Sequence, residues 1–242
     1  MSDQKEDAGA TVAALRRRLA SMSGSAGQPG PAVLAVPEPL TGVLPRRGLV
    51  RGAVTEVSGA MTLPAALLAA ATAAGATAAL VGLPQLNLAM AADLGADLSR
   101  IAVVEEPGVD RLEVAGVLLD GVDLVLVAVS QVTPSRARVL GGRARRQGAV
   151  LVAVGAPGSW PGATVRLSAR IAGYRHLPLR RNGYGRIGGL QVDIGAAGSG
   201  VAPREIRCEL VTPGYGESGA LRLTARDSRV QGRPAEFRQV AN

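Results

Sequence analysis

Five short apolar runs recur along the middle of the chain, at Ala53–Ser58, Ala76–Gly82, Ile101–Glu105, Asp123–Val129 and Ala149–Gly155. Successive runs begin about 22–26 residues apart, and each is rich in Val, Leu and Ala. Runs that are apolar on both faces are typical of strands buried in a parallel sheet. The pattern therefore predicts five parallel strands.

Helical patterns separate these runs and predict helices over 64–74, 87–94, 110–119 and 134–147. Thr62 is expected to cap the first helix, with Pro64 at its first position and Gly75 as its stop. Alternation of strand and helix at this spacing predicts an α/β fold with a mainly parallel central sheet flanked by helices.

The pattern changes after residue 155. Shorter or alternating runs lie at Thr164–Ala172, Leu190–Ile194, Glu205–Thr212 and Ala220–Ala225, with Gly and Pro between them. These predict antiparallel strands added to one edge of the sheet.

The predicted α/β domain covers residues 33–226 and begins with an extended lead-in at Val33–Arg51. Residues 1–32 are predicted to be a flexible segment with a short amphipathic helix at 11–20, and residues 227–242 a flexible polar tail.

The formal net charge of +8 is unevenly distributed. Residues 38–131 hold 5 Arg against 10 acidic residues, whereas residues 132–242 hold 18 Arg against 6. No Asp or Glu occurs from Leu124 to Val192. All but one of the 27 basic residues are Arg and Ala and Gly are abundant, as G+C-rich coding produces, so the total charge alone says little about nucleic acid.

Several classes are excluded by composition. One cysteine, Cys208, excludes an internal disulfide and a cysteine-based zinc site, and one histidine, His176, excludes the common histidine-based metal sites. We therefore expect no metal and no cofactor, and we interpret both residues as structural. The polar start of the chain predicts no signal peptide, and the charge-free run Val57–Ala92 is broken by Pro and Gly, so we expect a cytoplasmic protein without a membrane span.

The first predicted strand–turn–helix is the default ligand site of an α/β sheet. A phosphate-binding loop needs several glycines, a Lys for the phosphates and a Ser or Thr for Mg²⁺. Here Gly59 and Thr62 remain, Met61 stands before Thr62, and no Lys is present.

This arrangement resembles the core domain of the RecA recombinase superfamily over residues 40–212. Glu56–Gly59 is similar to the end of its first strand, and the stretch 93–104 is similar to its turn into the third strand. The resemblance implies that an active ATPase would carry a catalytic Glu near Leu83 and a metal-positioning Asp at Ala128. With both acids and the Lys replaced, the resemblance implies a core that does not hydrolyse ATP.

Within the superfamily the chain most resembles the actinobacterial ImuA-type (ImuA-prime) accessory proteins of damage-induced mutagenesis. That resemblance implies an ImuB-type, Y-family-like polymerase scaffold as partner, and indirectly an error-prone DnaE-type polymerase, in translesion synthesis. Two alternatives remain, namely a SulA-type inhibitor of a cell-division GTPase and a weak nucleotide-binding ATPase.

Candidate contacts to DNA or to a partner lie mainly in the basic half. We single out Arg136, Arg138, Arg143, Arg145, Arg146, Arg180, Arg181, Arg186, Trp160 and Phe237. The arginines are suited to phosphate contacts or to an acidic partner surface, and equally to a solvated helix face. Trp160 is expected either to anchor an interface or to pack over the sheet edge, and Phe237 to be a docking point in the tail.

Overall fold

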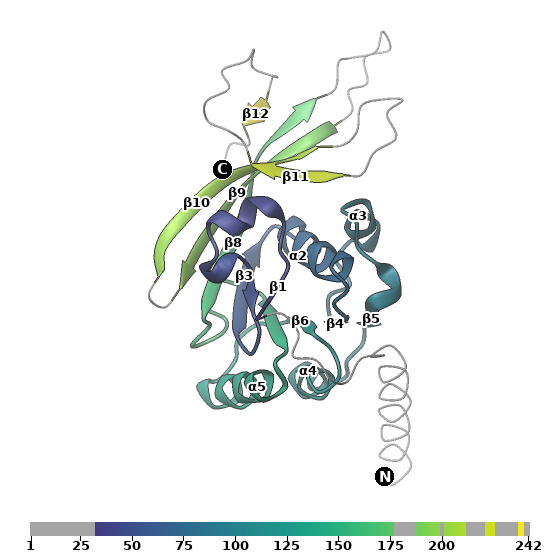
Figure 1. Ribbon diagram of the computed structural model, residues 1–242, viewed down its shortest axis with the longest axis vertical. Coiled ribbons are helices and arrows are strands. Elements are labelled where there is room, and N and C mark those ends of the chain that lie inside the picture. The colour runs from purple at the N-terminus through teal and green to yellow at the C-terminus, as the bar shows by residue number, and fades with distance from the viewer. Residues whose placement is uncertain (1–31, 177–186, 199–200, 212–220, 226–236, 240–242) are drawn as a thin grey trace.

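A computed structural model describes residues 32–176, 187–198, 201–211, 221–225 and 237–239. Its main sheet has ten strands among these residues, in the order β11–β10–β9–β8–β3–β7–β6–β4–β5, with β12 paired to β8 (Figure 1). The predicted α/β fold, with a large, mostly parallel sheet, flanking helices and C-terminal antiparallel strands, is confirmed.

The five parallel strands lie within three residues of the predicted bounds. They are β3 (Val54–Gly59), β4 (Ala78–Val81), β5 (Ile101–Val104), β6 (Leu124–Ala128) and β7 (Val150–Val154). Four of them are buried almost throughout, whereas β5 forms one edge of the sheet and is partly exposed. Burial on both faces is the reason that their apolar runs have no polar alternation.

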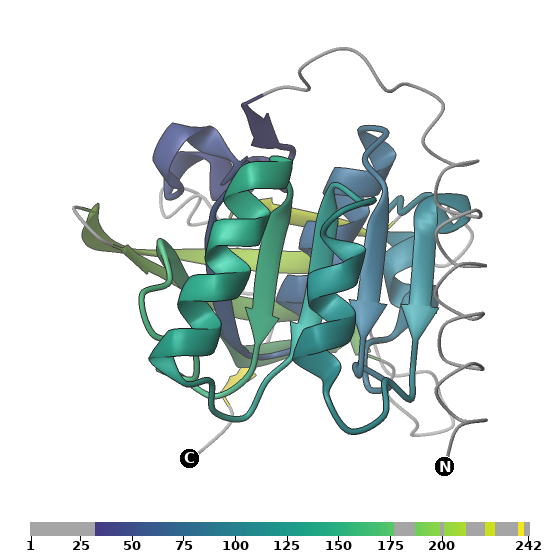
Figure 2. The ribbon, with the colours of Figure 1, turned by 90° about the horizontal axis from the view of Figure 1, so that it is seen from below.

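The helices cover both faces of the parallel strands. Helices α2 (Thr62–Ala73) and α3 (Leu88–Asp93) pack into one apolar cluster, and α4 (Arg111–Leu118) and α5 (Pro134–Gln147) into another. Figure 2 shows α4 and α5 side by side across one face. Alternate residues of each strand supply the two clusters, so the sheet separates two layers of core.

The predicted cap of the first helix is wrong. Helix α2 begins at Thr62 rather than at Pro64, and its N-cap residue is Met61, which makes no capping hydrogen bond through its side chain. Helices α3 and α4 do have capping side chains, because Asn87 accepts from the Met90 N–H and Asp110 from the Leu112 and Glu113 N–H groups.

Three of the four added strands are longer than predicted, and one of the four is parallel to its neighbour rather than antiparallel. They are β8 (Val165–His176), β9 (Ile187–Gly198), β10 (Val201–Val211) and β11 (Arg222–Ala225). Strand β8 pairs parallel with β3, whereas the β8–β9, β9–β10 and β10–β11 pairs are antiparallel. The chain crosses over β3 after β7, which makes β8 a sixth parallel neighbour before the hairpins begin.

Strand β12 (Phe237–Gln239) lies in the segment expected to be a loose tail. It pairs with Gly173–Arg175 of β8. The pairing of β8 with β3 ends at Ala169, so the far end of β8 extends past β3 and leaves a backbone edge that β12 occupies.

The lead-in is folded rather than extended. It contains β1 (Val33–Leu34), the 3₁₀ turns η1 (Glu38–Gly42) and η2 (Pro45–Arg47), and β2 (Leu49–Val50), which pairs with β1. Its leucines enter the same core cluster as residues of β9 and β10. The segment therefore covers the α2 face of the antiparallel strands. Among the described residues no helix combines the length and apolarity needed to cross a bilayer.

Candidate functional site

After the carboxyl ends of β4 and β6 the chain turns to opposite faces of the sheet, although the two strands are neighbours. Strand β4 leads to α3 on one face and β6 to α5 on the other. In open α/β sheets such a divergence forms the crevice in which ligands bind. The structure brings Leu83 and Ala128 to this crevice, and Gly59, Met61 and Thr62 to the same edge at the end of β3.

This crevice is filled with apolar side chains. Leu83 is 5% exposed and Ala128 is 9% exposed, and both belong to the cluster that continues under α2. Met61 packs against the same cluster. Two of the positions at which an ATPase of this type would carry acids, and the Met61 position in its loop, thus contribute to the hydrophobic core.

The turn between β3 and α2 has few backbone N–H groups left for a phosphate. The Ala60 N–H donates to the Ala169 carbonyl at 2.9 Å and the Leu63 N–H to the Ala60 carbonyl at 3.2 Å, while Pro64 has no N–H. The Thr62 hydroxyl is buried without a hydrogen-bond partner. A phosphate cradle needs several amides that converge on one point, and this turn uses two of its amides to hold its own shape.

Gly59 is required by packing at this turn. Its φ is +88°, and a Cβ there would lie 2.0 Å from the Ala169 carbonyl oxygen. Parallel pairing of Gly59 with Ala169 causes this close approach. The glycine that resembles a phosphate-loop residue therefore has a structural role.

Glu56, in the middle of β3, is buried with 2% of its surface exposed. One carboxylate oxygen accepts from the Gly158 N–H, and the other lies 3.3 Å from Nε of Arg166 without hydrogen-bond geometry. The side chain thus ties the turn after β7 to the sheet, and it does not face the crevice between β4 and β6.

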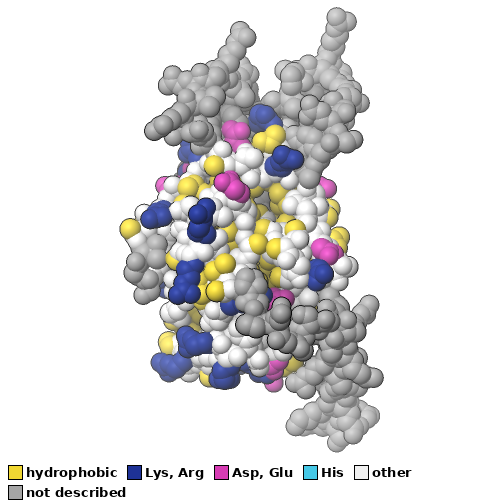
Figure 3. Space-filling view, viewed as in Figure 1, with side chains coloured by type: hydrophobic (Ala, Val, Ile, Leu, Met, Phe, Trp, Pro, Cys, Tyr) yellow, Lys and Arg dark blue, Asp and Glu magenta, His cyan; other side chains and the backbone are white. Residues whose placement is uncertain are grey.

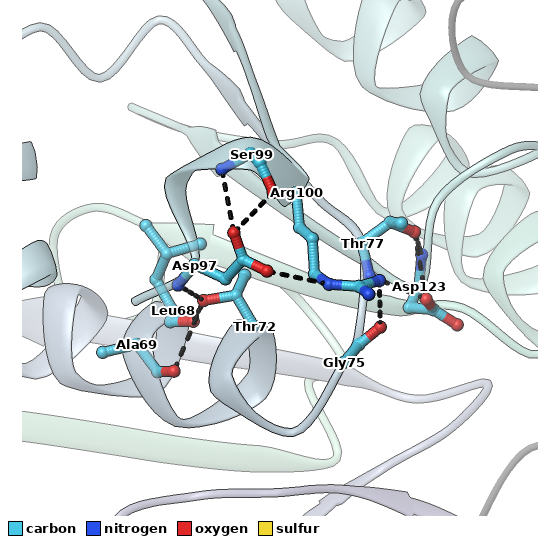
Figure 4. A network of polar contacts seen from close by, with 9 residues as sticks. All are labelled: Leu68, Ala69, Thr72, Gly75, Thr77, Asp97, Ser99, Arg100 and Asp123. Carbon is cyan, nitrogen blue, oxygen red and sulfur yellow. Dashed lines mark hydrogen bonds and ion pairs between the residues drawn. The ribbon is translucent and has the colours of Figure 1, made fainter. Parts of the chain in front are cut away.

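Residues 93–104, the stretch singled out above for its similarity to the RecA superfamily, lead into β5. Their polar contacts lie at the amino ends of the parallel strands, away from the turn after β3 (Figure 4). Asp97 accepts from the N–H and hydroxyl of Ser99 and pairs with Arg100, whose guanidinium donates to the Gly75 carbonyl at 2.8 Å. The Asp97 N–H donates to the Thr72 hydroxyl at 3.2 Å. Hydrogen bonds from Ser99 are the main reason that the pKa of the Asp97 carboxyl is lowered. The network fastens β5 to the end of α2.

A second network at this edge centres on Asp123, at the start of β6. Its carboxylate accepts from the N–H and hydroxyl of Thr77 at 2.9 and 3.0 Å and from Arg51 at 2.8 Å. Burial opposes ionisation, but these three donors outweigh it and hold the pKa of the Asp123 carboxyl below its usual value. The resulting contacts join β2, β4 and β6.

The five arginines of α5 fall into two groups that differ in their ion pairs. Arg136 pairs with Asp110, and Arg143 donates through Nε to Asp120 at 2.8 Å, so both face α4. The hydrogen bond to Asp120 is also the main reason that the pKa of the Arg143 guanidinium is raised. The other three are exposed, and no ion pair to a carboxylate is found for them within the described residues; they are Arg138, Arg145 and Arg146.

Other candidate residues have different outcomes. Trp160 is only 1% exposed and packs in the core with α4 and α5, so it is not an exposed anchor. The turns on either side bury it beneath the crossover from β7 to β8. Arg180, Arg181 and Arg186 lie outside the described residues, and so does the side chain of Phe237. Cys208 is buried as expected, and its burial raises the thiol pKa to about 11.

Two polar features were missed by the sequence analysis. Asp193 of β9 is buried, and its carboxylate accepts hydrogen bonds from Arg170 of β8 and Arg207 of β10 at 2.5 Å each. The hydrogen bond from Arg207 is the main cause of the lowered pKa of Asp193. The other feature is the exposed pair Arg46–Arg47 in η2. Only the Pro45 and Gly48 that flank this pair signalled a tight turn. Among the described residues there is no cluster of side chains suited to a metal ion.

Comparison with known proteins gives two matches. Residues 42–162 match the sequence family described as the MT3502 N-terminal domain. An uncharacterized protein of Mycobacterium tuberculosis, Rv3395c, is 40% identical over 208 residues, which cover 81% of this chain and 97% of that protein.

Proposed function

We propose that this chain, which belongs to the MT3502 N-terminal domain family, is a non-catalytic accessory protein of the RecA-like, ImuA type. In this proposal it acts in the cytoplasm, in translesion synthesis after DNA damage. It binds an ImuB-type, polymerase-like scaffold protein and thereby supports an error-prone DnaE-type polymerase.

One observation carries the non-catalytic part of the proposal. Leu83 and Ala128 are packed in the core at the crevice where the fold would otherwise place a nucleotide. Phosphoryl transfer needs cationic groups and a positioned metal ion at that point. Apolar side chains supply neither of these, and no Lys or Arg stands anywhere between Arg51 and Arg100.

The same packing suits an adaptor. In a nucleotide-dependent protein, the loops after the strands change conformation with the ligand. Here core packing and internal hydrogen bonds fix the turn after β3, so the surfaces of the domain keep one arrangement without a ligand. A rigid interface binds with less loss of conformational entropy.

The nucleotide part is tested by calorimetry and turnover on the full chain. We expect no heat on titration with Mg-ATP, and no more turnover than in the Thr62→Ala variant. Turnover by the wild-type chain clearly above that variant would contradict the proposal.

The partner part is tested by co-elution of the full chain with a purified ImuB-type scaffold. We expect a complex whose Kd is the same with and without Mg-ATP. Absence of a complex would contradict the adaptor role. A change of Kd of about tenfold or more with ATP, equivalent to about 1.4 kcal/mol, would show a nucleotide switch and contradict the non-catalytic role.

A further inference from the structure

Five exposed arginines, two in η2 and three in α5, are called here the basic ridge. They are Arg46, Arg47, Arg138, Arg145 and Arg146. We propose that the basic ridge binds the phosphate backbone of duplex DNA. The inference deepens the proposed accessory role and rests on it for its biological setting.

The geometry of α5 separates structural from available cations. Arg136 and Arg143 are seven residues apart and therefore share the flank that faces α4, where each pairs with an aspartate. Arg138 and Arg145 have the same spacing on another flank and lie about 10 Å apart along the axis. Arg146 follows in the last turn, where the helix dipole also favours it. The dipole does not account for Arg138, which is two turns away.

The backbone of η2 is strained where it carries two cations. Arg46 and Arg47 have φ values of 58° and 61°, and they are the only non-glycine residues with positive φ among the described residues. Such strain costs about 1–3 kcal/mol per residue and is typical of functional sites. Gly48 fixes the turn, because a Cβ there would lie 2.6 Å from the Leu34 carbonyl oxygen. Both arginine side chains are exposed at this turn.

The two parts of the ridge belong to one side of the molecule. Gly52 follows β2 and packs against the backbone of Arg145, since a Cβ at Gly52 would lie 3.1 Å from the Arg145 Cα. Arg47 is five residues before Gly52, so it lies at most about 18 Å from that contact. Figure 3 shows Lys and Arg side chains gathered along this side, over the η1–η2 segment and α5.

A repeating polyanion fits this surface better than an acidic protein does. Stable protein interfaces have an apolar core, whereas the only exposed large hydrophobic residue found on α5 in the described chain is Val139. No Asp or Glu occurs in the sequence from Leu124 to Val192. Strand β6, helix α5 and strand β7 therefore carry no negative side chain that would repel a phosphate. Contacts to a backbone need only spaced cations.

The test measures fluorescence anisotropy of a labelled 24-base-pair duplex with the full chain between 50 and 200 mM NaCl. With four or five phosphate contacts, we expect log K to fall with log [NaCl] at a slope of about −4. The double variants Arg138→Ala/Arg145→Ala and Arg46→Ala/Arg47→Ala should each weaken binding at least about tenfold and reduce the slope by about 2.

The matched control is Arg136→Ala/Arg143→Ala, which removes the same charge from the same helix on the flank that faces α4. It should change affinity less than about threefold. Thermal melts identify any variant that fails to fold. Because the two ridge variants lie on separate elements, one still tests DNA binding if the other does not fold. Equal losses in all three variants would overturn the proposal, as would tighter binding to polyglutamate than to the duplex. Failure of the wild-type chain to bind the duplex would overturn it too, while leaving the DNA-free scaffold assay unaffected.

Discussion

At the amino edge of the parallel strands, the Asp123 carboxylate accepts hydrogen bonds from neighbouring elements, and the Asp97 N–H donates to Thr72 of α2. At the carboxyl edge of the same strands, Leu83 and Ala128 are packed in the core. In an α/β enzyme the carboxyl edge would be the polar one, because ligands bind there. The difference teaches that polar groups in this domain lie where they join elements, and that the edge at which α/β enzymes bind ligands is here part of the core. The following predictions begin with the largest expected effect.

The largest contrast is expected between two glycines with nearly the same φ. Gly59, at the carboxyl edge, has a φ of +88°, and a Cβ added there would lie 2.0 Å from the Ala169 carbonyl oxygen. Gly75, at the amino edge, has a φ of +92°, and a Cβ added there would meet no atom within 4 Å. Gly59→Ala should lower the free energy of unfolding by about 3–5 kcal/mol, and Gly75→Ala by about 1 kcal/mol. Urea unfolding of both variants measures this, and equal losses would show that the approach of β8 to Gly59 is not tight.

Placing an acid at the carboxyl edge should destabilise the domain rather than create a site. Leu83→Glu places a charge in an apolar cluster and should cost about 3 kcal/mol or more. The volume-conserving Leu83→Met should cost less than about 1.5 kcal/mol. Both are measured by urea unfolding together with ATP turnover. A Leu83→Glu protein as stable as the wild type would mean that this edge is open to water.

Removing an acid from the amino edge should have a smaller but clear effect. Asp123→Ala leaves the Thr77 N–H and Arg51 without their acceptor and should cost about 2–3 kcal/mol. Ser130→Ala, an exposed position just after β6 at the carboxyl edge, should be neutral within about 0.5 kcal/mol. If the two variants unfold at the same urea concentration, the polar contacts of the amino edge do not stabilise the domain.

The pH dependence is expected to be the weakest effect. The pKa of Asp123 in the folded protein lies below its usual value of 3.8. Its contribution is therefore fully present above about pH 4 and is lost as the pH falls through the lowered pKa. The stability difference between wild type and Asp123→Asn should shrink between pH 6 and pH 3 in urea titrations. A difference that grows as the pH falls would mean that the folded pKa is raised.

The positions of the parallel strands could be predicted because their signal is local. A strand buried on both faces must be apolar throughout, and that requirement is visible in β6 and β7 as runs of Val and Leu. The apolar character of Met61, Leu83 and Ala128 could also be read, since these residues are present in the sequence whatever the fold. The cap at Thr62 was predicted wrongly, because the tight turn at Gly59 starts the helix two residues early.

The division of α5 into two flanks could not be predicted. Its five arginines look alike in the sequence, and only the packing of α4 beside α5 assigns Arg136 and Arg143 to aspartates. The burial of Trp160 likewise depends on its packing with α4 and α5, which lie earlier in the chain.

The sequence by itself determined the buried strands, the apolar residues Met61, Leu83 and Ala128 and the uneven charge, since each of these depends only on residue type and local spacing. The tertiary structure alone decided that β8 runs parallel to β3, that the crevice is filled, and which arginines are left without a carboxylate among the described residues. These depend on contacts between residues far apart in the chain, and local periodicity contains no information about them.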